Sequence, residues 1–253
     1  MLFQLLDQVC ADIGRIKVDE AMTALTPVVQ RNCPDLAGEW SAQIKAQGGP
    51  AGPDAGVTGV ALFALVSILG APALTKKMAE KIGDRSVSAG RRCALASVLA
   101  YVVQPHDLIP DDAPGGYGYL DDVILLRAGL VQYLNVLPQP ELGTEKETVV
   151  ISFLIRAAPP AVRPLLQQAV STMSLAVQLM EMLEPGIAEF MLAQIIANPV
   201  QMTAPAAPQG FVPRPMPNYQ QGFFGRSGAY VEGNNIMFAG GPSLIDGQLF
   251  IPG

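Results

Sequence analysis

Charged residues are scarce in this sequence. Only 15% of the 253 residues are Asp, Glu, Lys or Arg, while 50% are hydrophobic, and ordinary soluble domains carry about 25% charged residues. A surface with so few charges disfavours a highly soluble, independent monomer, and the hydrophobic content excludes disorder of the whole chain. The 16 Lys and Arg are outnumbered by 22 Asp and Glu, which gives a net charge of −6. We therefore expect no nucleic-acid partner.

Residues that carry catalytic chemistry are also few. The single histidine, His106, sits at a proline turn, and the sequence has no G-x-S-x-G, P-loop, G-x-G-x-x-G or H-E-x-x-H motif. A serine or cysteine nucleophile would need a base beside it. The three cysteines, Cys10, Cys33 and Cys93, include no C-x-x-C pair, which argues against a disulfide framework or a thiolate zinc site. We expect no enzymatic activity and no resident cofactor.

The N-terminal residues do not have the pattern of an export signal. The stretch is apolar at its start but has no basic region before the apolar residues, and Asp7 and Asp12 interrupt it. A secretory signal peptide needs a basic region, an uninterrupted apolar core and a small-residue cleavage site. Together with unpaired cysteines, this predicts a cytoplasmic protein.

The spacing of apolar residues predicts a mainly α fold, a multi-helix bundle up to about residue 200. The expected helices cover residues 2–24, 34–47, 85–103, 121–137, 149–157, 161–183 and 186–198, beside an apolar stretch at 55–75. Gly and Pro connectors divide the chain into N-terminal helices (1–54), a helical core (55–137), C-terminal helices (138–200) and an extended arm (201–253). The methionines of the late helices, including Met180 and Met182, are expected mainly in the core, although methionine also suits adaptable binding grooves.

Residues 55–75 contain no charged side chain. Their number is sufficient for a membrane span of about 20 residues, and Lys76, Lys77 and Lys81 follow, as at a cytoplasmic membrane boundary. However, glycines, hydroxyl residues and the interior Pro72 dilute the apolar character. We prefer a helix buried by neighbouring helices and keep membrane association as the alternative.

The composition changes after residue 200. Residues 200–253 carry only four charged side chains, and five prolines between 205 and 217 favour extended backbone over helix. Two short β-like runs follow, 231–240 and 245–253, each with an acidic-Gly turn before an apolar strand. We predict a Pro/Gly-rich arm with short β-strands. Its expected partner-binding residues are Phe223, Phe224, Ile236, Phe238, Leu249 and Phe250.

The densest motif lies in residues 94–130, ALASVLAYVVQPHDLIPDDAPGGYGYLDDVILLRAGL. It resembles the DUF1232 (YkvA-like) family of small bacterial helical domains. That family has a helix ending in an apolar-Pro-x-Asp-Leu-Ile-Pro-Asp turn, a Gly-containing loop, and Leu-Asp-Asp at the start of the next helix. The matching residues are Tyr101, Pro105, Asp107, Leu108, Ile109, Pro110, Asp111, Gly118, Leu120, Asp121 and Asp122. The resemblance implies a fold fragment and no mechanism.

Elementary chemistry gives this segment two interpretations. In the first, Pro105 ends one helix, Asp107 caps the turn at 108–111, and Asp121 and Asp122 are stabilised at the positive end of the next helix. In the second, Asp107, Asp111, Asp121 and Asp122 supply oxygen ligands to a divalent cation such as Mg²⁺ or Ca²⁺. The spacing does not match an EF-hand loop, and we prefer the capping interpretation.

The function that we expect follows from the composition of the arm. An apolar, nearly uncharged segment cannot form a core of its own, and left free it would aggregate. Its apolar side chains would be buried if its short strands add to a sheet edge or lie along grooves of neighbouring molecules. The prediction is a structural or interaction protein whose partner is a protein, either another copy or an assembly component. The alternatives are a membrane-associated helical protein and a metal-binding protein or enzyme at the Asp-rich corner.

Overall fold

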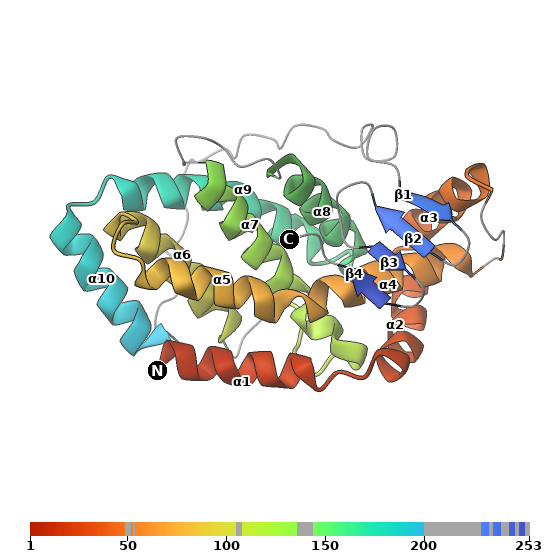
Figure 1. Cartoon of the computed structure of the whole chain (residues 1–253), viewed down its shortest axis with the longest axis horizontal. Coiled ribbons are helices and arrows are strands. Elements are labelled where there is room, and N and C mark those ends of the chain that lie inside the picture. Colours follow the sequence, from red (N-terminus) through yellow and green to blue (C-terminus); the bar gives the residue numbers. More distant parts are fainter. Residues whose placement is uncertain are drawn as a thin grey trace.

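The computed structural model describes residues 1–48, 52, 54–104, 108–135 and 144–199, together with the backbone of four short strands nearer the C-terminus. The helices, drawn in Figure 1, are α1 (Leu2–Gly14), α2 (Val18–Asn32), α3 (Pro34–Ala46), α4 (Ala55–Leu69), α5 (Ala71–Gly83), α6 (Ala89–Val102), the 3-10 helix η1 (Pro114–Tyr119), α7 (Leu120–Asn135), α8 (Thr144–Ala157), α9 (Arg163–Glu181) and α10 (Pro185–Ala197). The predicted mainly helical class is confirmed.

Prolines define where several of these helices begin. Pro34, Pro72, Pro164 and Pro185 each occupy the first or second position of a helix. The first turn of a helix needs no N–H donor from proline, and the fixed φ of proline suits it. The start of α6 uses a different device, since the hydroxyl of Ser88 accepts a hydrogen bond from the backbone N–H of Arg91 at 3.3 Å.

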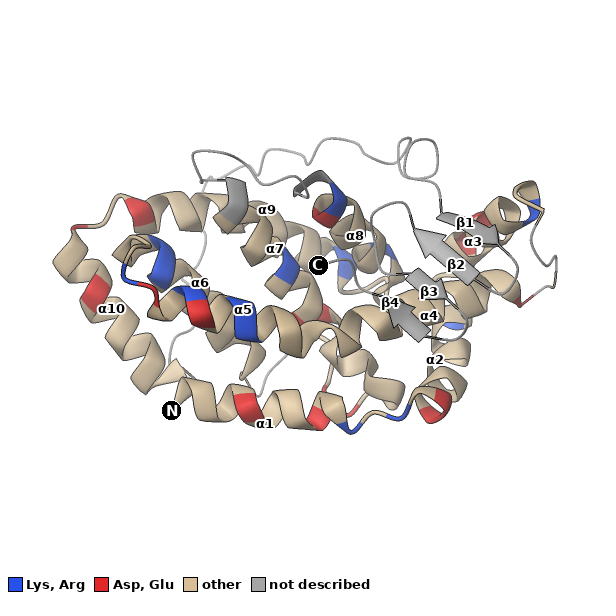
Figure 2. Ribbon diagram, viewed as in Figure 1, with Lys and Arg blue, Asp and Glu red and all other residues tan. Residues whose placement is uncertain are grey.

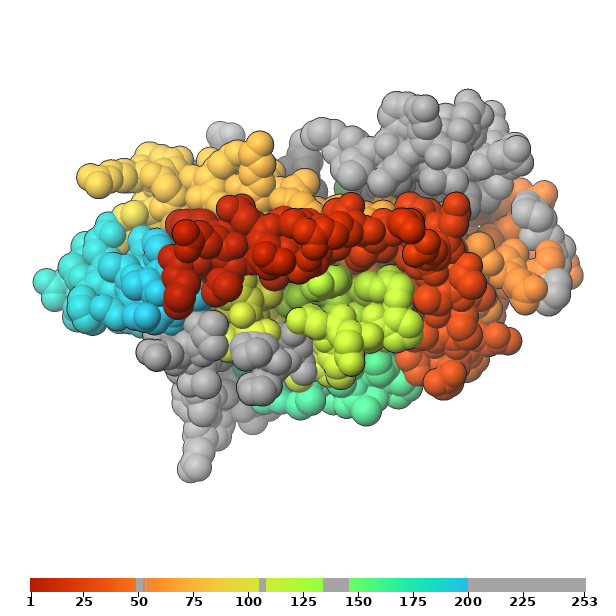
Figure 3. Space-filling model, turned by 90° about the horizontal axis from the view of Figure 1, so that it is seen from below, coloured from red at the N-terminus to blue at the C-terminus, as the bar shows by residue number. Residues whose placement is uncertain are grey.

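The first expected helix, residues 2–24, is two helices. Helix α1 ends at Gly14, where the N–H groups of Arg15 and Ile16 bond three residues back, and Lys17 adopts extended backbone before α2. The apolar spacing continues through the break, and the pattern alone therefore did not reveal it. The break turns α2 onto α4 and η1, while α1 runs across one face of the molecule, red in Figure 3.

Helix α4 lies in the core. Its fully buried side chains include Val60, Ala64 and Ile68, and it packs against α2, α3, α7 and α8. No charged residue interrupts its ribbon in Figure 2. The stretch Ala55–Gly83, which contains α4 and α5, is long and apolar enough to cross a membrane, and half of its most apolar 18-residue window is buried inside the protein. Burial by neighbouring helices therefore accounts for much of its apolar character.

The backbone towards the C-terminus contains strands β1 (Ala229–Glu232), β2 (Asn235–Phe238), β3 (Ser243–Ile245) and β4 (Gln248–Phe250). They form an antiparallel sheet in sequence order, with Tyr230 opposite Met237 and Leu244 opposite Leu249. The side chains of these strands, and all of residues 200–228, lie outside the described part of the chain. The partner-binding role of Ile236, Phe238, Leu249 and Phe250, and of Phe223 and Phe224, thus stays a prediction.

Candidate functional site

The corner between α6 and α7 is built around one buried carboxylate. Asp121, in the first turn of α7, has no exposed surface. Its Oδ2 accepts hydrogen bonds from the backbone N–H of Leu108 at 3.0 Å, the backbone N–H of Ile109 at 3.3 Å and the hydroxyl of Tyr101 at 3.1 Å. Asp121 therefore joins the end of α6, the turn after it and the start of α7 through a single oxygen atom.

The turn at residues 108–111 is capped by Asp121 from the start of α7. The sequence predicted Asp107 as the cap of residues 108–111, whereas the structure shows Asp121 accepting from two N–H groups of that turn. Asp107, with Pro105 and His106, lies outside the described residues, and its own role stays a prediction. Ile109 in the turn and Leu120 at the start of α7 are buried in the core and pack the two sides of the corner together.

The loop before α7 is shaped by glycines. Gly115 and Gly116 have φ of 69° and 78°, the left-handed region that side chains with a Cβ disfavour. Gly118 serves a close approach instead, because a Cβ there would lie 2.5 Å from the carbonyl oxygen of Pro110 and 2.6 Å from Cα of Asp111. The glycines let η1 pack onto α2 and α4 and let the turn close over the start of α7.

Replacing Gly118 by Ala tests this close approach. We expect Gly118→Ala to lower the free energy of unfolding by about 1–3 kcal/mol, because an added methyl group must displace backbone atoms of the turn. Urea unfolding followed by circular dichroism measures the change. The matched control is Gly38→Ala in the exposed face of α3, where no atom lies within 4 Å of the added Cβ; there a gain of up to about 1 kcal/mol is expected. Equal effects at both positions would contradict the packing described.

Burial dominates the electrostatics of the corner. It raises the pKa of Asp121 above the ordinary value of 3.8, although the three hydrogen bonds to Oδ2 act in the opposite direction. Burial also raises the pKa of Tyr101, and the nearby carboxylates of Asp121 and Asp122 raise it further. The hydroxyl of Tyr101 consequently stays protonated and serves as a fixed donor to Asp121.

The raised pKa of Asp121 predicts a pH dependence of stability. Because the folded protein binds this proton more tightly than the unfolded chain, the resulting stabilisation is complete below 3.8 and is lost as pH rises through the raised pKa. We expect the wild-type protein to gain stability relative to Asp121→Asn, which does not titrate, between about pH 7 and pH 4. Urea unfolding of both proteins across that range measures the difference. A difference that is constant, or that shrinks on acidification, would contradict the assignment.

A second polar cluster fixes the other end of η1. The hydroxyl of Tyr117 donates to the carbonyl oxygen of Ala157 at the end of α8, at 2.6 Å, and accepts from the amide of Asn32 at 3.4 Å. The guanidinium of Arg163 donates to the carbonyl oxygens of Asn32 at 2.6 Å and Ala158 at 2.9 Å. Sequence reasoning did not single out these residues, because three of the four contacts join residues that are 40 to 131 positions apart.

The four candidate metal ligands are not all brought together by the described structure. Asp121 and Asp122 are buried side by side in α7, with 0% and 2% exposure, whereas Asp111 is exposed on the turn. Among the residues that the structure describes, no group of three or more His, Cys, Asp or Glu side chains is arranged to hold a metal ion. The described residues of the corner stabilise the turn at 108–111.

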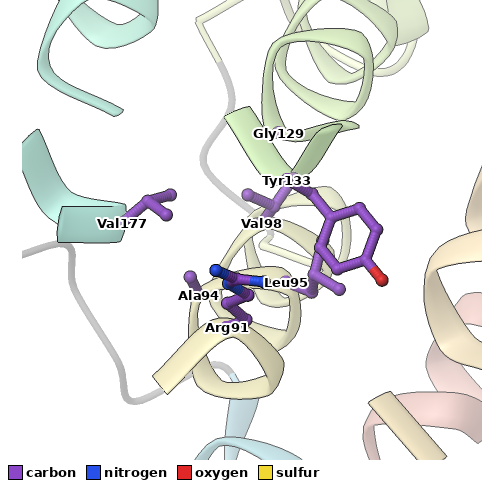
Figure 4. A pocket seen from close by; sticks show the side chains of 7 residues that line it. All are labelled: Arg91, Ala94, Leu95, Val98, Gly129, Tyr133 and Val177. Atoms are coloured by element: carbon purple, nitrogen blue, oxygen red, sulfur yellow. The ribbon is translucent and has the colours of Figure 1, made fainter. Parts of the chain in front are cut away.

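A small pocket lies between α6, α7 and α9, towards the ends of α6 and α7 that are away from the corner. Figure 4 shows its lining residues, among them Arg91 and Leu95 from α6, Gly129 and Tyr133 from α7, and Val177 from α9. Its volume of about 10 Å³ corresponds to about one water molecule. Organic substrates of ordinary size need several hundred Å³, so this pocket is not a substrate site.

The corner coincides with the stretch that matches a known sequence family. Residues 91–127, from the first turn of α6 to the middle of α7, match the family described as Protein of unknown function (DUF1232). The match confirms the resemblance found in residues 94–130 and is restricted to that segment of the chain. No curated protein and no solved structure matches the chain.

Proposed function

We propose, from the premise that residues 91–127 are a DUF1232 segment, that this chain is a non-enzymatic structural or interaction protein. Its helical body joins a larger assembly through the apolar arm at 201–253. The observation that carries the proposal is the composition of residues 200–253, which contain five phenylalanines and four charged side chains. A segment of this kind gains free energy by burying its apolar side chains against another surface.

The body supports an interaction role more than a catalytic one. Asp121, whose pKa is raised by burial, has no exposed surface and uses Oδ2 to hold backbone groups. A catalytic acid or base must come within hydrogen-bond reach of a substrate. The corner therefore serves as a rigid joint in the helical body, in keeping with a scaffold that presents the arm.

A full-length variant tests the proposal. We expect wild-type protein to form particles of at least twice the chain mass of 26.7 kDa in light scattering after size exclusion. Replacing Phe223, Phe224, Phe238 and Phe250 together by Ser should reduce the particles to the mass of one chain. The control is Phe3→Ser in α1, a phenylalanine that is 37% exposed outside the arm and should leave the mass unchanged. Equal masses for the wild-type protein and the arm variant would contradict the proposal.

Membrane association is the second candidate, favoured by the span Ala55–Gly83, which is long and apolar enough to cross a bilayer. On this alternative the protein is recovered only with detergent, whether or not the arm is altered. The interaction function instead predicts a cytoplasmic protein that stays in the supernatant without detergent. Sedimentation of a cell extract at high speed distinguishes the two.

A further inference from the structure

Large apolar side chains are exposed where α9 turns into α10. Leu179 and Met182 are 50% and 82% exposed, and Ile187 and Phe190 are 49% and 65% exposed. Leu179 lies three residues before Met182, the C-cap of α9, and Ile187 lies three residues before Phe190 in α10. This spacing places the two members of each pair on one side. We call these four residues the apolar corner. Met182 was expected in the core with the other late methionines, and its exposure corrects that expectation.

The apolar corner is held on a fixed support. On the opposite side of α10, Ala188, Leu192 and Ile195 are buried, and α10 packs along α6. The half-exposed Glu189 pairs with the buried guanidinium of Arg92, which also donates to the carbonyl oxygen of Val87 at 3.1 Å. These contacts hold α10 in place. A partner that binds its exposed face therefore does not have to order the helix first, which would cost conformational entropy.

The end of α9 is held against the start of α6. Glu181 accepts from the hydroxyl of Ser88 and pairs with Arg91 at 3.3 Å. Gly90 allows the close approach, because a Cβ there would lie 2.3 Å from the carbonyl oxygen of Met180. Both helices that carry the apolar corner are thus anchored to the start of α6 (Figure 1).

The chain leaves the described fold at the far end of α10. Pro199 is buried, and its carbonyl oxygen accepts from the side-chain amide of Gln104 at 2.9 Å. The 13 residues of α10 make a helix of about 20 Å at 1.5 Å per residue, with Ile187 in its first turn and this exit beyond its last turn. The 54 residues from 200 to 253 begin there, and their five phenylalanines supply aromatic side chains for the apolar corner, which is flanked by the exposed Glu184 and Glu189.

The length of the chain after Pro199 allows the arm to reach another molecule. Phe223 is 24 positions beyond Pro199, and the five prolines at 205–217 favour an extended chain of about 3.1 Å per residue. The proposed function assigns the arm to contacts between copies, and we therefore take the arm of a second copy as the occupant.

We propose that the apolar corner is the docking site for the arm of a second copy of this chain. This inference rests on the proposed function and adds the surface that receives the arm. Aromatic and aliphatic side chains of the arm cover Met182, Ile187 and Phe190 of the neighbour. Removing a few large apolar side chains from such a contact is sufficient to abolish it, because few residues carry most of the binding free energy.

Two full-length variants test the docking site by complementation. The corner variant carries Met182→Lys, Ile187→Lys and Phe190→Lys, and the arm variant is the fourfold Phe→Ser protein described above. Each alone should have the mass of one chain by light scattering, and an equimolar mixture should give a 1:1 pair, because one supplies an arm and the other a corner. The control is Leu165→Lys at the start of α9, 48% exposed, which should keep the wild-type mass.

Three results would overturn the inference. A corner variant with wild-type mass, beside a monomeric arm variant, would leave the proposed function standing and remove the docking site. Two monomeric variants that do not pair would show that assembly needs an arm and an apolar corner on the same chain, as when the arm binds within its own chain. Wild-type mass for both variants would remove the proposed function itself. Circular dichroism confirms that each variant retains the helical fold of the wild-type protein.

Discussion

Asp121→Ala is expected to lower the free energy of unfolding by about 3–5 kcal/mol. The substitution removes the acceptor of two backbone N–H groups, at Leu108 and Ile109, and of the hydroxyl of Tyr101. Each donor left buried without a partner costs about 1–3 kcal/mol. Relief from burying a carboxylate whose pKa is raised offsets part of this loss. Urea unfolding followed by far-ultraviolet circular dichroism measures the change.

Two further variants separate this role from a general effect of acidic residues. Asp112→Ala, on the exposed part of the same turn, should stay within about 0.5 kcal/mol of wild type. Asp121→Asn keeps one acceptor oxygen and the shape of the side chain, so its loss at neutral pH should be smaller than that of Asp121→Ala. Equal losses at positions 121 and 112 would remove the structural role that we assign to the buried carboxylate.

Phe63→Ala in α4 is the second substitution with a large expected effect, a loss of about 3–5 kcal/mol. Phe63 is 5% exposed, and its ring lies 4.5 Å from that of Phe153 and 6.0 Å from that of Trp40, centroid to centroid. Truncation leaves a cavity where α3, α4 and α8 meet, and the surrounding rings cannot close it fully. Chemical unfolding in buffer without detergent provides the measurement.

The matched control is Phe3→Ala in α1, where the ring is 37% exposed and a loss below about 1 kcal/mol is expected. This comparison also bears on the membrane alternative. If α4 were exposed to lipid, Phe63→Ala would leave the stability of the protein in buffer nearly unchanged. A loss at Phe63 no larger than that at Phe3 would therefore contradict the core position of α4.

Local chemistry predicted much of the helical body. Residues close in sequence were sufficient to predict helices that overlap α3, α6, α7, α9 and α10. They did not reveal α5, because Pro72 was taken as interior to one apolar stretch at 55–75 and instead lies at a helix start. The corner between α6 and α7 was predicted because its turn residues, glycines and first-turn aspartates lie within one short motif. The DUF1232 match to residues 91–127 confirms the resemblance that this motif carries.

Features that depend on contacts distant in sequence were not predicted. The break between α1 and α2 keeps the apolar spacing and is fixed by what each helix packs against. Tyr117 and Ala157 are 40 residues apart, and Arg156 pairs with Glu39 across 117 positions at 2.7 Å. The exposure of Met182 depends likewise on which face of the α9–α10 turn meets α6. Periodicity indicates that a residue is apolar, and only the packing shows whether another helix covers it.

The central claim is that the apolar arm joins this protein to further copies of itself. The most direct test is the solution mass, by light scattering after size exclusion, of the full-length protein beside a chain that ends at Met202. We predict full-length particles containing two or more chains, and a shortened chain that is soluble, helical and of the mass of one molecule. Identical masses for the two proteins in detergent-free buffer would contradict the claim.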